Sequence, residues 1–342
     1  MRGCVDMKKV IIALFAVALL LLFVANIVYG SVDIPLSGVI DVIMGRECSD
    51  VWRLIVVETR LPQAVVAVLA GAAISVAGLV LQTLFNNPLA GPEVLGINSG
   101  AGLGVAVVML LVQGPLFAGA MGLDGYFAVL AGAFIGSLTV ISLILLLSSM
   151  LHSKLYLLIA GVAVSFLVSS AISILNYFAT SEGVHSYMIW GMGSFSGVSL
   201  SQLPLFAMPV VLLLAITLLK TKSLNALLLG DDYAANLGVD VMTARVVLLA
   251  VVGLIIAVVT AFCGPVTFIG LAVPHIARLL LKSSNHNYLL PATMLAGASV
   301  ALLCNIICQL PGESGLMPLA AVTPLVGAPV IIYVLLRNRG NL

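Results

Sequence analysis

Stretches of about 20 apolar residues recur along this chain from Val10 to Leu336, and the short loops between them hold almost all of the charge. A helix needs about 20 apolar residues to cross the hydrocarbon core of a bilayer. Charged residues make up 8% of the chain and hydrophobic residues 62%. A soluble domain of that composition would lack a polar surface to face water. The sequence therefore predicts an all-α, polytopic membrane protein.

The apolar pattern predicts ten transmembrane spans. Helices are favoured over barrel strands because the apolar runs are continuous, whereas a barrel strand alternates in polarity. The eighth span contains Pro274, His275 and Arg278, so a break within it is an open alternative. The predicted spans are 10–30, 60–84, 93–112, 124–150, 154–178, 202–220, 243–262, 266–282, 289–309 and 318–337.

The distribution of lysine and arginine predicts the orientation. Cytoplasmic loops of membrane proteins are enriched in these residues, and an even number of spans places both termini in the cytoplasm. There is no basic tract suited to nucleic acid. The cytoplasmic set is Arg2, Lys8, Lys9, Lys154, Lys220, Lys222, Arg245, Arg278, Lys282, Arg337 and Arg339, against Arg46, Arg53 and Arg60 outside. The predicted outer acidic residues are Asp33, Asp41, Glu47, Asp50, Glu58, Asp124, Glu182 and Glu313.

The beginning of the chain resembles a secretory signal, because Lys8 and Lys9 precede an apolar run. That run is long for a signal peptide, and no small-residue cleavage site precedes Ser31. We therefore expect a retained first helix, with either Met1 or Met7 as the start.

Missing motifs exclude several functions. The chain has no phosphate-binding P-loop, no His-Glu-x-x-His motif and no Gly-x-Ser-x-Gly motif. Its spans are almost free of Asp and Glu, which ion-coupled transporters usually need. Cys304 and Cys308 are four residues apart, but no further metal ligand is evident, so packing is favoured. We expect no catalytic residue, no bound metal and no cofactor on this chain. Energy for transport must come from another chain.

Residues 82–92 form the first informative motif. Gln82 is followed by Asn86-Asn87-Pro88-Leu89-Ala90-Gly91-Pro92, whose prolines and glycine break the helix at the predicted cytoplasmic boundary. Two interpretations stay open: an ordinary hairpin loop, or a rigid constriction that faces a pathway.

Small residues at four-residue spacing form the second motif. Residues 96–104 contain four glycines, and Gly71 with Ser75 and Gly132 with Gly136 repeat the spacing. Such residues let helices approach closely in lipid. We expect a compact bundle without a wide permanent pore.

The long predicted cytoplasmic loop contains the third motif. Residues 227–238 predict a short amphipathic helix between Gly230 and Gly238, with acidic residues in its first turn. A surface helix of no special role is one interpretation. The apolar residues Tyr233, Ala234 and Leu237 favour a docking surface for a soluble partner.

Residues 264–278 form the fourth motif. His275 and Arg278 lie three residues apart near the predicted cytoplasmic end of the eighth span. This spacing favours an arginine that extends toward the membrane interface and a buried histidine hydrogen-bonded to backbone.

Together these motifs resemble the FecCD-like permease family, the membrane subunits of ATP-binding-cassette (ABC) importers for vitamin B12, haem and iron–siderophore complexes. The resemblance covers about Trp52 to Arg339. The matching stretches are Arg60-Leu61-Pro62, Gln82 with Asn87-Pro88-Leu89-Ala90-Gly91-Pro92, Leu95-Gly96-Ile97 with Gly100-Ala101, Trp190 with Gly193-Ser194, Leu229-Gly230 with Ala234 and Leu237-Gly238, Gly270-Leu271 with Pro274-His275-Ile276-Ala277-Arg278, and Gly327-Ala328-Pro329.

The resemblance implies one permease domain over residues 1–342, with a coupling-helix loop at about 221–242. It implies an inner-membrane homodimer, two ATPase subunits that carry ATP and Mg, and a periplasmic or lipid-anchored substrate-binding protein. The resemblance assigns coupling to the ATPase to Leu229, Gly230, Asp231, Asp232, Ala234, Leu237 and Gly238. It assigns a cytoplasmic gate to Asn87, Pro88 and Leu89, and the outer part of the pathway to the fifth span with Trp190, Gly193, Ser194 and Phe195.

The predicted docking face for the binding protein departs from the family pattern. Arg60 is kept, but Gln63 replaces a second arginine, and Asn305 and Gln309 stand where many members have Asp and Arg. A Glu-Leu-Pro sequence becomes Leu316-Met317-Pro318. We therefore hypothesise a binding protein whose contact face is less acidic than usual, or basic.

Alternatives to an ABC permease remain at this point. An ion-coupled secondary transporter would need a carboxylate in mid-membrane. An intramembrane hydrolase would need a nucleophile paired with a base. A receptor-like protein would leave the helix at residues 230–238 without a role. The sequence does not determine the chelate.

Overall fold

The computed structural model describes residues 2–111, 123–151, 153–310 and 315–338. Within these ranges every regular element is a helix, so the predicted all-α fold is confirmed. Three residues used in the sequence predictions, Met1, Glu313 and Arg339, lie outside the described residues.

The described residues divide into two compact units. The first comprises Met1–Val76, Ser194–Leu212 and Phe268–Leu342, and the second comprises Ala77–Gly193 and Leu213–Thr267. Two of the four boundaries fall within α4 (Leu61–Leu84) and α9 (Leu203–Leu219), and the other two lie between helices. The prediction of a single permease domain stays a prediction.

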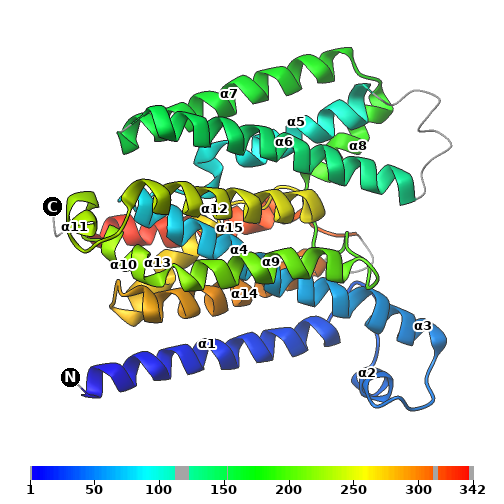
Figure 1. The fold of residues 1–342 in the computed structure, drawn as a ribbon. Helices are drawn as coiled ribbons and strands as arrows, with labels where there is room; N and C mark the ends of the chain where they lie inside the picture. Colours follow the sequence, from blue (N-terminus) through cyan, green and yellow to red (C-terminus); the bar gives the residue numbers. More distant parts are fainter. Residues whose placement is uncertain (1, 112–122, 152, 311–314, 339–342) are drawn as a thin grey trace. The chain divides into compact units, whose positions relative to one another are not determined.

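The first unit is built around α14 (His286–Gln309), which packs against α1, α13 and α15. Figure 1 shows α1 (Arg2–Val28), in blue, running along α14, in orange. Two short helices, α2 (Leu36–Ile43) and α3 (Asp50–Leu54), follow α1. A π-helical turn, Ile55–Arg60, leads from α3 into α4. The unit also contains α13 (Ile269–Leu281) and α15 (Leu319–Asn338).

The second unit centres on α5 (Ile97–Ala106), which packs against α6 (Leu123–Met150), α7 (Lys154–Phe178) and α12 (Val241–Cys263). A 3₁₀ turn, Pro92–Leu95, precedes α5, and a π-helical turn, Val107–Leu111, follows it. The unit also contains α8 (Ser181–Gly191), α10 (Thr221–Leu227) and α11 (Asp231–Asn236). Figure 1 shows α11 beside one end of α12, which it contacts.

Each of the ten predicted spans coincides with an apolar helix of the structure. Among the described residues, six helices are long and apolar enough to cross a membrane. A seventh is added if α9 and α10, which meet at 55°, form one span. The other predicted spans correspond to the shorter apolar helices Ile97–Leu111, Ile269–Leu281 and Leu319–Tyr333. Helices suit this role because they satisfy their backbone hydrogen bonds internally.

The eighth predicted span differs from the structure at its start. The span was predicted from residue 266, whereas α13 begins at Ile269, because Phe268 adopts a left-handed conformation with φ of 64°. The helix then continues through Pro274, so the open alternative of a break there is not observed. A proline is tolerated within a helix in lipid when neighbouring groups satisfy the freed carbonyl.

Small residues bring helices into close contact in both units, as the spacing predicted. In the first unit, a Cβ atom added to Gly71 would overlap the carbonyl of Gly297. In the second unit, Gly104 faces Gly132 and Gly100 faces Gly136 so closely that added Cβ atoms would overlap the opposite backbone. Close backbone approach of this kind is a main source of helix association in membranes.

Candidate functional site

The short helix predicted between Gly230 and Gly238 forms as α11. Gly230 has a φ of 107° and Gly238 a φ of 82°, backbone conformations that residues other than glycine rarely adopt. The Val239 N–H donates to the Ala234 carbonyl at 3.0 Å and ends the helix. The two glycines therefore set the length of α11.

An exposed apolar stripe runs along α11. Leu229, Tyr233 and Leu237 follow one another at four-residue spacing, and their exposed fractions are 61%, 56% and 59%. Ala234, next to Tyr233 in the chain, is fully buried. Tyr233 and Leu237 lie one turn apart on one helix face, whereas Leu229 lies in the turn before Gly230, outside α11. We call these three exposed side chains the apolar stripe. An exposed apolar surface on a loop of this kind is typical of a docking site. The predicted exposure is confirmed for Tyr233 and Leu237 and wrong for Ala234, whose small side chain packs inward. The predicted docking stays a prediction.

A single carboxylate connects α11 to two other helices. Asp231 Oδ1 lies 2.9 Å from Lys154 Nζ, and Asp231 Oδ2 lies 2.9 Å from Arg245 Nη2. Lys154 is the first residue of α7, and Arg245 lies one turn into α12. The Lys154 and Arg245 side chains are 24% and 12% exposed. From the sequence, Lys154 and Arg245 are predicted only to lie on the cytoplasmic side, and their shared contact with Asp231 is not predicted.

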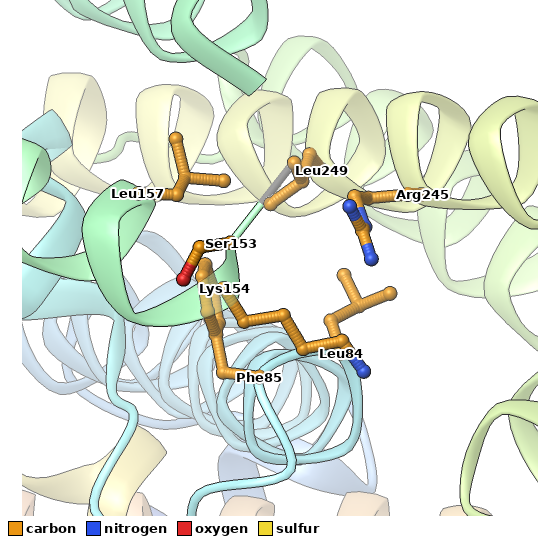
Figure 2. A pocket seen from close by; sticks show the side chains of 7 residues that line it. All are labelled: Leu84, Phe85, Ser153, Lys154, Leu157, Arg245 and Leu249. Carbon is orange, nitrogen blue, oxygen red and sulfur yellow. The ribbon is translucent and has the colours of Figure 1, made fainter. Parts of the chain in front are cut away.

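A small pocket lies beside the cluster (Figure 2). Its volume is about 10 Å³, which is close to the space that one water molecule needs. Figure 2 shows the side chains of Lys154 and Arg245 at its wall, together with apolar residues from three segments. The pocket is too small for a chelate and does not represent a substrate site. The lining residues are Leu84, Phe85, Ser153, Lys154, Leu157, Arg245 and Leu249.

The predicted gate residues follow Leu84 and Phe85 of this pocket in the sequence. The turn begins after Phe85, where Asn86 adopts a φ of 47°. Asn87 Oδ1 accepts a hydrogen bond from the Leu89 N–H at 2.9 Å, which stabilises the turn. Pro88 and Leu89 are exposed. The sharp helix break predicted here is confirmed, and a gating role stays a prediction.

Trp190, predicted for the outer pathway, stacks on Tyr187 within α8, with ring centroids 6.1 Å apart. A Cβ atom added at Gly264 would lie 2.7 Å from the Trp190 carbonyl oxygen, so this close contact requires glycine. Gly193, two residues after the end of α8, has a φ of 67°. These residues belong to the second unit.

Ser194 and Phe195, the other predicted outer residues, belong to the first unit. The Ser194 and Ser196 hydroxyl oxygens lie 2.7 Å apart, and Phe195 is 1% exposed. A pathway role for these residues stays a prediction.

The residues predicted to dock a binding protein are buried. Arg60, Gln63 and Gln309 are 4%, 8% and 8% exposed. The Arg60 guanidinium donates to the carbonyl oxygens of Ile27 and Val28 at 2.9 and 2.6 Å, and also to that of Val32. Arg60 thus fixes the chain where α1 ends. Docking through these three side chains stays a prediction, and it requires them to become exposed on binding.

Four buried amides form a hydrogen-bonded chain across three helices of the first unit. Gln309 Nε2 donates to Gln63 Oε1 at 3.3 Å, and Gln63 Nε2 donates to Asn305 Oδ1 at 3.0 Å. Asn305 Nδ2 donates to Asn26 Oδ1 at 2.7 Å, and Asn26 Nδ2 donates to the Leu302 carbonyl at 3.1 Å. We call these four side chains the amide chain. It connects α1, α4 and α14. The sequence signal was the presence of amide side chains within apolar spans, Asn26 in the first, Gln63 in the second, and Asn305 with Gln309 in the ninth.

The motif around His275 lies in α13. Pro274 and His275 are buried, and Arg278 is half-buried. The predicted burial of His275 is therefore confirmed. Among the described residues no group of three or more His, Cys, Asp and Glu side chains lies close enough to hold a metal ion. Cys304 and Cys308 are both buried and free.

Comparisons with known proteins agree on one family. The FecCD transport family matches residues 18–337. The vitamin B12 import system permease protein BtuC of Klebsiella pneumoniae subsp. pneumoniae is 39% identical over 298 residues, which is 87% of each chain. BtuC of Escherichia coli O9:H4 is 40% identical over 290 residues, or 84% of this chain and 85% of that one. A solved structure described as "An inward-facing conformation of a putative metal-chelate type ABC transporter" has a TM-score of 0.83, is 27% identical, and is matched over 96% of this chain and 99% of that chain.

Proposed function

This chain belongs to the FecCD transport family and is the inner-membrane permease subunit of an ABC importer, and we propose that it carries a metal chelate inward by alternating access. The chelate class is a corrinoid, haem or a ferric siderophore. The relatives described as vitamin B12 permeases support a corrinoid first, and the metal-chelate type of the similar solved structure supports the wider class.

The observation that carries the proposal is the exposed apolar stripe of α11, formed by Leu229, Tyr233 and Leu237. An ABC permease has ATPase partners, which bind ATP and Mg in place of this chain. Burial of this stripe in a groove of the ATPase would remove apolar surface from water, which favours association. The glycines at both ends limit the length of α11.

In the proposed cycle two copies of the chain enclose a central pathway. ATP binding closes the two ATPase subunits and displaces both α11 helices, and ATP hydrolysis resets them. The displacement spreads as rigid-body motion of packed helices. A periplasmic or lipid-anchored binding protein delivers the chelate from outside, and both termini of the permease lie in the cytoplasm. The metal stays within its chelator throughout.

The test reconstitutes the permease with the ATPase encoded beside it, in lipid nanodiscs. Cobalamin, haem and ferric siderophores are offered, each with its own binding protein, and ATP hydrolysis is measured. We expect one loaded binding protein to stimulate hydrolysis, which identifies the substrate. Failure of any ATPase to associate, together with uptake that needs none, would instead indicate an ion-coupled secondary transporter.

A matched pair of variants tests the docking surface. Tyr233→Asp places a charge in the apolar stripe of α11 and is expected to reduce co-purification of the ATPase. Tyr29→Asp is the control, because Tyr29 is 66% exposed but directly follows α1, on the predicted outer side. Equal co-purification of the ATPase with both variants would contradict docking at α11.

A further inference from the structure

We infer that Asp231 is a positioning residue that fastens α11 to α7 and α12, so that the ATPase moves all three helices together. This inference rests on the proposed function, because it assumes that α11 receives the displacement. It assigns to Asp231 a task different from ATPase docking: the transfer of movement into the membrane-spanning helices.

The geometry of one carboxylate shared by two cations carries the inference. Each oxygen of Asp231 accepts from a different helix, Lys154 Nζ of α7 on one side and Arg245 Nη2 of α12 on the other, both at 2.9 Å. Charge-assisted hydrogen bonds of this length are among the strong ones. The Asp231 side chain is 34% exposed and its partners less, so solvent screens the cluster only in part.

Helix dipoles strengthen the need for this carboxylate. Lys154 is the first residue of α7, where the positive end of the helix dipole disfavours a cation. Asp231 is the first residue of α11, where an anion is favoured. A single negative charge therefore compensates Lys154, Arg245 and the helix ends near them. Loss of the Asp231 charge leaves two cations close to one another without their shared partner.

α11 packs against α10 and α12, whereas few contacts other than the Asp231–Lys154 pair join it to α7. It has six residues, and an isolated helix of that length is not stable in water. Ala234 is its only fully buried residue. Its attachment to α7 therefore depends on the Asp231–Lys154 pair. Without this pair, α11 could move without moving α7.

The cluster also adjoins the predicted gate. Lys154 and Arg245 line the small pocket together with Leu84 and Phe85, which lie directly before the turn at residues 86–89 (Figure 2). Because residues from the end of α4, from α7 and from α12 line the same small pocket, we expect a shift of α7 or α12 to reach the end of α4. Asp231 thus connects α11 to the turn through packed contacts within one compact unit.

The experiment measures transported substrate per ATP hydrolysed in proteoliposomes that contain the whole importer. Asp231→Asn keeps the shape of the side chain and removes its charge. We expect transport per ATP to fall by roughly fivefold to tenfold, as expected for two partly screened ion pairs, and co-purification of the ATPase is measured alongside. Asp231→Glu, which keeps a carboxylate, is expected to restore most of the coupling.

Asp240→Asn is the matched control. Asp240 lies in the same loop and is exposed, and its hydrogen bonds go to Thr243 in its own helix. Asparagine also caps helices well. This variant removes the same charge and is expected to leave transport per ATP unchanged.

Lys154→Met and Arg245→Met each remove one of the two cations that pair with Asp231. Each is expected to lower transport per ATP, and neither is expected to add to the loss in Asp231→Asn, because side chains that act as one unit are not additive. These two variants also decide the matter if Asp231→Asn does not fold.

Three outcomes would overturn the inference. The proposed role of Asp231 is excluded if Asp231→Asn and Asp240→Asn transport equal amounts per ATP. It is also excluded if the loss in Asp231→Asn adds fully to the loss in Lys154→Met or Arg245→Met. Loss of ATPase co-purification in Asp231→Asn would assign Asp231 to docking instead. A wild-type permease that binds no ATPase overturns the proposed function itself, and that result is distinct from the other outcomes.

Discussion

Removal of Asn305 tests how much the amide chain stabilises the first unit. Asn305 is 3% exposed, accepts from Gln63 Nε2 and donates to Asn26 Oδ1. Asn305→Ala removes both hydrogen bonds and leaves one buried donor and one buried acceptor without these partners. A hydrogen bond between membrane helices contributes about 0.6 kcal/mol on average and up to about 1.7 kcal/mol. We therefore expect a loss of about 1–3 kcal/mol in the free energy of unfolding.

The assay is unfolding in mixed micelles by added denaturing detergent, with helix content as the readout. Ser299→Ala is the control, because Ser299 lies on the same helix and its hydroxyl donates only to the Leu295 carbonyl of that helix. Asn26→Ala combined with Asn305→Ala should lose less than the sum of the single variants, since the two side chains share a bond. A loss in Asn305→Ala no larger than in Ser299→Ala would refute the argument.

Three further predictions concern other contacts. Gly104→Ala should lower the free energy of unfolding by about 1–3 kcal/mol, because the added Cβ meets the Gly132 carbonyl. Gly191→Ala is the control: its added Cβ has no atom within 4 Å, so the same detergent titration should show a smaller loss of stability. Arg60→Lys should destabilise by about 2 kcal/mol, because a lysine cannot reproduce the guanidinium contacts with three carbonyls; unchanged stability would contradict this. Hydrogen bonds from Thr243 hold the pKa of Asp240 below its usual 3.8. The ionised Asp240 therefore stabilises the folded protein above pH 3.8, and this stabilisation is lost as the pH falls through the folded-state pKa. Thermal melting curves of Asp240→Asn, measured over this pH range, should lack this pH dependence.

The sequence determined the helical fold, the ten apolar segments and the position of α11. These features depend on local composition: a run of apolar residues must be helical in lipid, and Gly230 and Gly238 limit the helix between them. Close helix contacts at Gly100, Gly104, Gly132 and Gly136 were also predictable, because the four-residue spacing places small residues on one helix face.

The tertiary structure alone decided which distant residues meet. Lys154 and Asp231 are separated by 77 positions in the chain, and Gln63 and Asn305 by 242. A single sequence carries no signal for such pairs, because each residue is equally acceptable in its own segment. For the same reason the sequence predicted Gln63 and Gln309 as parts of an outer docking surface, whereas helix packing buries them in the amide chain. Composition thus decided which segments are helices, and packing between helices decided which polar groups stay exposed and which find partners inside.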